Sequence, residues 1–157
     1  MLALVRSQVP YELHTISHKI SQISAGKLIK KGKVRKIVGL DPASPLFRYR
    51  DLTGRLAEKD AKYVEILHSC AGLLGFSVPL GTASFYPNGG RSQPGCGWDL
   101  FGGCAHGRAY EFFAESLYNE NGFYAWHCDS FKALSKGKCQ VVNGIVKLGG
   151  EPGNVES

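Results

Sequence analysis

Two short apolar runs dominate the hydrophobic pattern of this chain of 157 residues. Residues 34–40 and 63–69 are rich in β-branched side chains, which is typical of buried strands. Residues 108–119 mix apolar and charged side chains at helical spacing, which predicts an amphipathic helix. We expect 13–30 to be irregular or helical, and 72–107 to form a long loop region.

Asp41 directly follows the first predicted strand. Pro42 cannot donate a hydrogen bond to a β-ladder, so pairing is expected to stop there and leave Asp41 at the strand's carboxyl end. Ligands bind at that end of open parallel sheets. A carboxylate there can accept a hydrogen bond from a histidine ring during acyl transfer. Alternatively, Asp41 only caps the following turn, and the motif alone leaves both interpretations open.

Charge and hydropathy restrict the classes of partner. The formal net charge is +6, and basic residues cluster between 27 and 36. We interpret that cluster as a solvated helix end and strand start, with attraction to anionic lipid as the alternative. No recognition fold or stacking platform accompanies the charge, so nucleic-acid binding is not expected. No apolar run is long enough to span a bilayer.

Several long motifs occur in a fixed order, namely residues 37–47, 60–69, 81–90, 93–96, 104–110 and 123–128. Together they resemble the secreted lipase family, which includes pancreatic and lipoprotein lipases, insect phospholipases and yolk proteins. The style is closest to the insect members, and the resemblance covers residues 25–154. It implies the α/β class, as the carboxyl-terminal part of an α/β-hydrolase fold. Such a part would be a partial, mostly parallel sheet with flanking helices and a short disulfide-pinned lid.

The resemblance implies two members of a catalytic triad. Asp41 matches the triad acid and His106 the triad base. His106 would take the proton from the nucleophile and hand it to the departing alcohol. His68 ends an apolar strand and is expected to be a hydrogen-bonded structural residue.

The third triad member does not follow the family pattern. This fold uses Gly-x-Ser-x-Gly, and that motif does not occur in the sequence. With a one-residue insertion Thr15 falls at the serine position, but Leu13 and Ser17 replace the flanking glycines. Thr15 is a weak candidate, because a β-branched residue suits a strained turn poorly. We expect 1–24 to be a degenerate or unrelated segment and 25–157 a partial lipase domain of a truncated chain.

The resemblance also implies two disulfides, Cys96 with Cys104 and Cys128 with Cys139. Metal ligation is the rival interpretation, but neither pair has a Cys-x-x-Cys spacing and no histidine pair accompanies them. Disulfides imply a secreted protein. Residues 1–10 do not make a good signal peptide, because a charged residue interrupts a very short apolar stretch.

The segment between Cys96 and Cys104 matches the lid of these lipases and is only seven residues long. A short lid resembles family members that act on phospholipids. Trp98, Leu100 and Phe101 would either dip into a lipid surface or pack against the protein body, and both interpretations stay open.

Calcium is the metal that the resemblance raises. Pancreatic-type lipases hold it with acidic side chains around the segment matching 52–60. Arg55 and Asp60 persist here, but Leu52 and Ala57 stand where carboxylates belong. A hard cation would lose two oxygen ligands, so we expect no metal and no cofactor.

By resemblance, the chain is a lipase- or phospholipase-like carboxylic ester hydrolase of lipid catabolism. As written it is expected to be inactive, because the nucleophile motif is missing. The alternatives are a non-catalytic lipid-binding or yolk-protein-like relative, and a gene-model fragment. The expected partner is a lipid or phospholipid at a membrane or lipoprotein surface.

Overall fold

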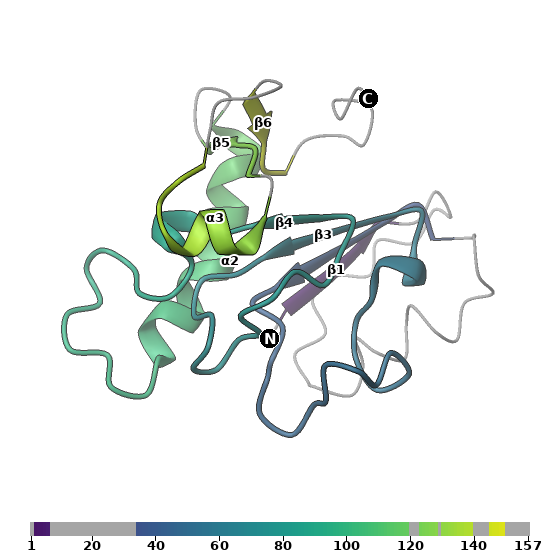
Figure 1. Cartoon of the computed structure of the whole chain (residues 1–157). Helices are drawn as coiled ribbons and strands as arrows, with labels where there is room; N and C mark the ends of the chain where they lie inside the picture. Colours follow the sequence, from purple (N-terminus) through teal and green to yellow (C-terminus); the bar gives the residue numbers. More distant parts are fainter. Residues whose placement is uncertain (1, 7–33, 120–122, 129, 140–144, 150–157) are drawn as a thin grey trace.

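The structure is a computed structural model that describes residues 2–6, 34–119, 123–128, 130–139 and 145–149. Within these residues, the main element is a four-stranded sheet of order β1-β2-β3-β4 (Figure 1). Its strands are β1 (Leu2–Arg6), β2 (Lys36–Leu40), β3 (Tyr63–Leu67) and β4 (Ala83–Phe85). Strands β2, β3 and β4 run parallel, and β1 pairs antiparallel with β2. A small, mostly parallel sheet is therefore present, as the family resemblance implies.

The two apolar runs form the central strands β2 and β3, as predicted. Every residue of both strands is buried, which is typical of parallel strands covered on both faces. One face packs against helix α2 and Leu148 through Val38, Leu40, Leu67 and Phe85. The other face packs against loop residues through Ile37, Val64 and Ile66. The core thus has two layers, and β2 and β3 lie between them.

Lys36 corrects the interpretation of the basic cluster as a solvated surface. Its exposed fraction is 9%, and its Nζ lies 3.0 Å from Oε2 of Glu65 on the neighbouring strand. Glu65 is 1% exposed, and its Oε1 accepts a hydrogen bond from the Gly149 amide. At the start of β2 the cationic side chain is therefore part of the interior.

Helix α2 (Gly103–Tyr118) begins at Gly103, whereas the predicted helix began at 108. Two of its first five residues are glycines, which lower helix propensity and led to the prediction of a loop there. Tertiary contacts hold this turn instead: Cys104 is disulfide-bonded, and Asp99 Oδ2 accepts a hydrogen bond from the Ala105 amide at 2.7 Å. That carboxylate satisfies an amide that lacks an intrahelical partner.

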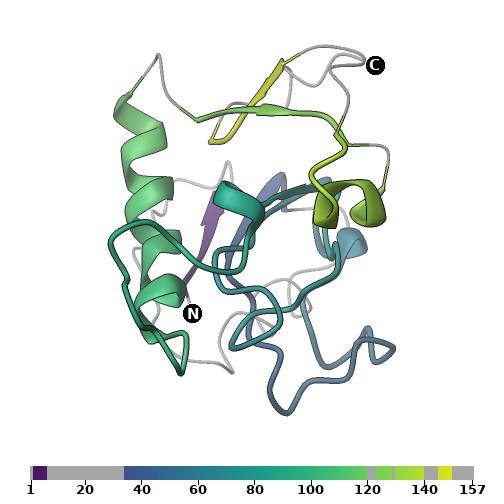
Figure 2. The same cartoon turned by 60° about the vertical axis from the view of Figure 1, so that its left-hand side comes forward.

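The remaining elements are short and were not predicted. Single turns η1 (Glu58–Asp60) and η2 (Pro87–Gly89) flank β3 and β4, so the predicted loop over 72–107 also contains β4 and η2. Strand β5 (Tyr124–Trp126) pairs antiparallel with β6 (Ile145–Lys147), and helix α3 (Phe131–Ser135) lies between them in the chain. Figures 1 and 2 place α3, β5 and β6 together on the β4 side of the sheet.

Both disulfides implied by the resemblance are present: Cys96 with Cys104 and Cys128 with Cys139. The paired cysteines are 8 and 11 positions apart. Closing each of these short loops restricts the unfolded chain and stabilises the fold by about 2–3 kcal/mol. In the described residues, no helix has the length and apolar character needed to cross a bilayer.

Candidate active site

Asp41 lies at the carboxyl end of β2, where strand pairing was expected to stop. Its amide donates to the Leu67 carbonyl at 2.7 Å, which ties it to the end of β3. Its φ is +47°, a left-handed conformation that costs a non-glycine residue about 1 kcal/mol or more. Its side chain is completely buried. The chain turns sharply here and directs the carboxylate into the protein.

A cradle of backbone groups surrounds the Asp41 carboxylate. Oδ1 accepts hydrogen bonds from the amides of Ser69 at 2.9 Å and Cys70 at 3.0 Å. Gly75 lies so close that a Cβ on it would come within 2.2 Å of Oδ1. Amide donors favour the ionised carboxylate, and the glycine permits their close approach. The resemblance assigned no role to these three residues.

His106 meets the other carboxylate oxygen. It lies in the first turn of α2, and its Nδ1 is 2.6 Å from Oδ2 of Asp41. The imidazole is 23% exposed, whereas the carboxylate is fully buried. The two predicted triad residues, 65 positions apart in sequence, are therefore in direct contact.

This contact fixes how the imidazole can act. An ionised carboxylate only accepts hydrogen bonds, so Nδ1 carries a proton, and in the neutral imidazole Nε2 then presents a lone pair. Among the described residues, no group hydrogen-bonds Nε2 of His106, and no serine or threonine hydroxyl reaches either ring nitrogen. An imidazole oriented in this way is suited to remove a proton from a hydroxyl placed beside Nε2. Thr15, the weak candidate for that hydroxyl, lies outside the described residues.

His68 is a second histidine near Asp41; it is buried and held as a structural residue, as predicted. Its Nδ1 donates to the Phe76 carbonyl at 2.9 Å, its Nε2 lies 3.4 Å from the Ser84 hydroxyl, and its ring stacks on Tyr86 at 4.3 Å. Burial lowers the pKa of His68 to about 4, although the Phe76 carbonyl and the Asp41 charge act in the opposite direction. His68 is therefore neutral at physiological pH.

The lowered pKa of His68 predicts acid sensitivity. Between pH 6.5 and about 4 the unfolded chain binds this proton and the folded chain does not, so stability is full above pH 6.5 and falls as the pH drops. Across that window we expect a loss of about 3 kcal/mol from this group. Urea unfolding at several pH values measures this loss in the free energy of unfolding. In His68→Gln the free energy of unfolding should change less over the same pH range. Parallel pH profiles for the two proteins would contradict the prediction.

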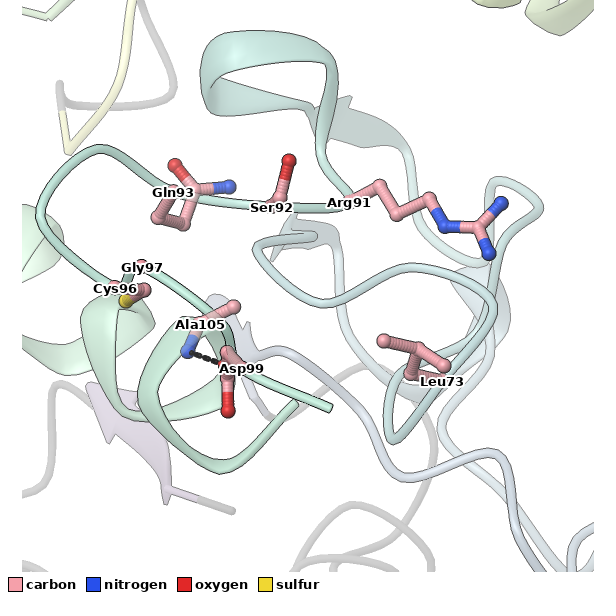
Figure 3. Close-up of a pocket in the computed structure, with 8 residues that line it drawn as sticks. All are labelled: Leu73, Arg91, Ser92, Gln93, Cys96, Gly97, Asp99 and Ala105. Carbon is pink, nitrogen blue, oxygen red and sulfur yellow. Dashed lines mark hydrogen bonds between the residues drawn. The ribbon is translucent and has the colours of Figure 1, made fainter. Parts of the chain in front are cut away.

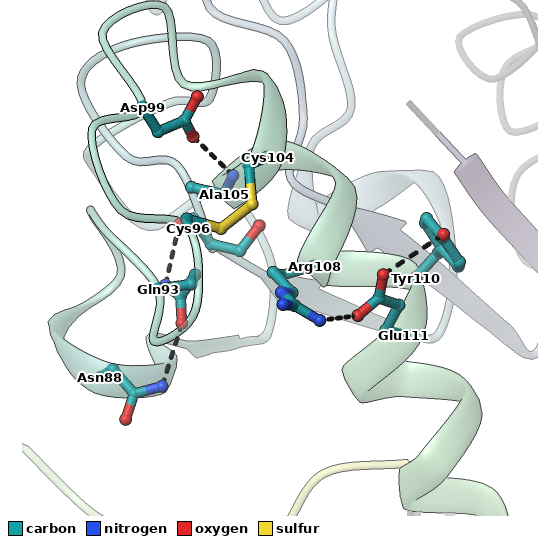
Figure 4. The surroundings of a disulfide bond; sticks show 10 residues. Asn88, Gln93, Cys96, Asp99, Cys104, Ala105, Arg108, Tyr110 and Glu111 are labelled. Atoms are coloured by element: carbon teal, nitrogen blue, oxygen red, sulfur yellow. Dashed lines mark hydrogen bonds and ion pairs between the residues drawn. A yellow bond between two sulfur atoms is a disulfide. The ribbon is translucent and has the colours of Figure 1, made fainter.

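The lid loop is anchored at its base and exposed at its tip. Figure 4 shows the Cys96–Cys104 disulfide beside the Asp99–Ala105 hydrogen bond. The side chains of Trp98, Leu100 and Phe101 are 95%, 73% and 85% exposed. The sequence left open whether these three side chains meet a lipid surface or pack against the protein body. In this structure they do not pack against the protein body.

Gln93, which sequence analysis did not single out, links the lid base to the Asp41 cradle. Its amide nitrogen donates to the Ser69 carbonyl at 2.9 Å, and its oxygen accepts from Asn88 at 3.0 Å. Since the Ser69 amide bonds Asp41, Gln93 holds the strand end that carries the cradle. Residues 93–96 were recognised as one of the motifs shared with the lipase family. Nothing in that motif predicts the hydrogen bond between Gln93 and Ser69.

A shallow pocket lies beside the first turn of α2, next to the position of His106 in the chain. Its lining includes Leu73, Arg91, Asp99 and Ala105 (Figure 3). Asp99 is engaged by the Ala105 amide, so its carboxylate is part of the helix cap. The pocket lining does not include His106.

A metal site is not apparent in the part of the chain that the structure describes. Among the described residues, suitable ligand atoms come together at Cys96, Asp99 and Cys104, but both sulfur atoms belong to a disulfide. In the segment compared with a calcium site, Asp60 accepts a hydrogen bond from the Ala57 amide at 2.9 Å. The Arg55 guanidinium donates to two backbone carbonyls there.

Comparison with known proteins decides the family. The family model described as "Lipase" matches residues 14–151. The chain belongs to the lipase family. It is 42% identical over 113 residues to lipase member H of Rattus norvegicus, which covers 69% of this chain and 25% of the relative. It is 33% identical to pancreatic triacylglycerol lipase of Oryctolagus cuniculus, covering 89% of this chain and 36% of the relative.

Lipoprotein lipase of Sus scrofa is 35% identical over 88% of this chain and 34% of its own length. This lipase-family chain thus spans about a quarter to a third of the length of these relatives. Family membership implies the α/β-hydrolase fold, and the described parallel sheet and α2 are part of such a fold.

Proposed function

We propose that this lipase-family chain carries the acid and the base of carboxylic ester hydrolysis on a lipid substrate. The observation that supports this is the 2.6 Å contact between His106 Nδ1 and the buried Asp41 carboxylate. Asp41 would hold the imidazole in the Nδ1-protonated tautomer and stabilise the imidazolium. His106 would accept the nucleophile's proton at Nε2 and pass it to the leaving alcohol.

We further propose that the chain as written does not turn over esters. The sequence contains no Gly-x-Ser-x-Gly, the motif that presents the serine on a strained turn. Without a nucleophile, the acid–base pair has no hydroxyl to activate. Thr15 remains the weak candidate for that position.

A second candidate function is lipid binding without hydrolysis. It is favoured by the exposure of Trp98, Leu100 and Phe101 on one short loop, because large apolar side chains in water are unfavourable unless they meet a partner. Aromatic and aliphatic tips of this kind insert into lipid interfaces. The same loop would serve a phospholipid-directed enzyme as a short lid.

The proposed location is extracellular. Two disulfides suit an oxidising compartment. A lipid or phospholipid, at a membrane or lipoprotein surface, is the proposed partner.

An ester assay tests the proposed inactivity. The purified chain should hydrolyse p-nitrophenyl butyrate no faster than buffer, because the base has no nucleophile to deprotonate. His106→Ala and Thr15→Val are the matched controls and should give the same background rate. Turnover that both substitutions abolish would instead identify Thr15 as the nucleophile and show that the chain is an active hydrolase.

A further inference from the structure

The segment after Asp41 forms two successive turns that project away from the sheet. The Phe47 amide donates to the Ser44 carbonyl at 3.1 Å, and the Asp51 amide donates to the Arg48 carbonyl at 3.0 Å. Phe47 packs against the core under the sheet and fixes the segment there. Figure 1 shows this blue segment between β2 and η1 as a loop that extends from the body of the protein. We call residues 45–50 the turn loop.

Leu46 is unfavourable in two ways for a protein in water. Its φ is +74°, at the third position of the first turn, which glycine or asparagine usually occupies. Its side chain is 96% exposed, the highest value among the large apolar residues described. Contacts within the described fold therefore do not offset the backbone strain at Leu46 or the exposure of its apolar side chain. A partner that receives Leu46 would supply the compensating contact.

Two cationic residues of the turn loop follow Leu46 in the sequence. Arg48 and Arg50 are both exposed, and neither forms an ion pair within the part of the chain that the structure describes. Asp51 is the acidic residue that follows the turn loop. Its Oδ1 accepts hydrogen bonds from the Thr53 amide and hydroxyl and from the Gly54 amide. The loop therefore presents an exposed leucine that two exposed arginines follow in the sequence.

A buried arginine holds the turn loop in place. Arg55 is 6% exposed, its Nε donates to the Tyr49 carbonyl at 2.7 Å, and its guanidinium lies 4.8 Å from the centre of the Tyr49 ring. The ring of Phe76 lies on the guanidinium at 6.0 Å. A loop fixed at Phe47 and Tyr49 presents Leu46 without a large ordering penalty on binding.

We propose that the turn loop docks onto an anionic phospholipid surface. Leu46 inserts into the boundary between headgroups and acyl chains, and Arg48 and Arg50 contact lipid phosphates. Charge complementarity commits the site to an anionic membrane, because two neighbouring arginines favour phosphate and an exposed leucine favours the acyl boundary. The proposal deepens the proposed association with lipid but does not depend on the Asp41–His106 pair.

Vesicle co-sedimentation of the full chain tests the proposal. Leu46→Gly removes the side chain and relieves the backbone strain, so its thermal midpoint should be unchanged or raised. Its affinity for phosphatidylcholine vesicles that contain about 30% phosphatidylserine should fall about tenfold or more. Arg48→Gln combined with Arg50→Gln should weaken binding to the same vesicles by about thirtyfold, and much less to neutral vesicles.

Two control variants separate the turn loop from other surfaces. Tyr118→Ala removes an exposed aromatic side chain at the carboxyl end of α2 and should leave binding unchanged. Trp98→Ala reports on the lid: if it abolishes binding while Leu46→Gly does not, the lid hypothesis survives and the turn-loop proposal is overturned.

Equal vesicle binding by wild type and Leu46→Gly also overturns the turn-loop proposal, as does the absence of vesicle binding. Concentration-dependent dimerisation in sedimentation velocity, lost in Leu46→Gly, would assign the loop to a second copy instead.

Discussion

Replacing Asp41 by alanine should lower the free energy of unfolding by about 3–5 kcal/mol. The carboxylate is fully buried and accepts hydrogen bonds from two backbone amides and from His106. Alanine would leave all three donors without their acceptor, and two of them belong to completely buried residues, Ser69 and Cys70. Urea unfolding followed by circular dichroism measures the loss, and a chain without a cooperative transition would be its extreme form.

Asp41→Asn separates the structural role from the electrostatic one. Its amide oxygen can still accept from the Ser69 and Cys70 amides, so we expect a smaller loss, of about 1–2 kcal/mol. Its NH2 group would then face His106 and favour the Nε2-protonated tautomer. Long-range ¹H–¹⁵N spectra distinguish the two tautomers. A loss in Asp41→Ala no larger than in the exposed Asp51→Ala, or an unchanged tautomer in Asp41→Asn, would contradict this account of the pair.

The central strands could be predicted from sequence, and the smaller elements could not. Residues of β2 and β3 are buried on both faces, so their apolar runs are continuous and easy to recognise. Strands of three residues, such as β4 and β5, are too short to show a period. The start of α2 depends on the Cys96–Cys104 disulfide and the Asp99 cap, which override the low helix propensity of its glycines.

The candidate site divides in the same way. Asp41 and His106 were assigned because long family motifs surround them, and the structure brings them into contact. The cradle around Asp41 is made of backbone amides and one close glycine, Gly75, and such groups leave no side-chain pattern to recognise. Leu46 was likewise missed. Its strain comes from a positive φ, and a leucine in the sequence does not indicate that backbone angle.

The ion pair between Lys36 and Glu65 is the second interior feature that hydrophobic patterning did not reveal. Both residues lie on the α2 face of the sheet, and the ammonium group also lies 5.6 Å from the centre of the Tyr63 ring. Burial, with a further contribution from the Glu65 charge, raises the pKa of Tyr63 to about 12. The Gly149 amide donates to Oε1 of Glu65, so this carboxylate connects β3 to the segment after β6.

Glu65→Ala should therefore lower the free energy of unfolding by about 3–5 kcal/mol, because it removes the buried carboxylate that pairs with the Lys36 ammonium group. Lys36→Met combined with Glu65→Leu should recover part of that loss, since apolar residues of similar volume often replace buried ion pairs at little cost. Recovery stays incomplete by about 1–3 kcal/mol, the penalty of the Gly149 amide that loses its acceptor. A double-mutant cycle by urea unfolding gives the coupling energy. Exposed ion pairs contribute less than about 1 kcal/mol. A loss of that size in Glu65→Ala would mean that water reaches the pair and that the Glu65 carboxylate does not tie the carboxyl-terminal segment to the sheet.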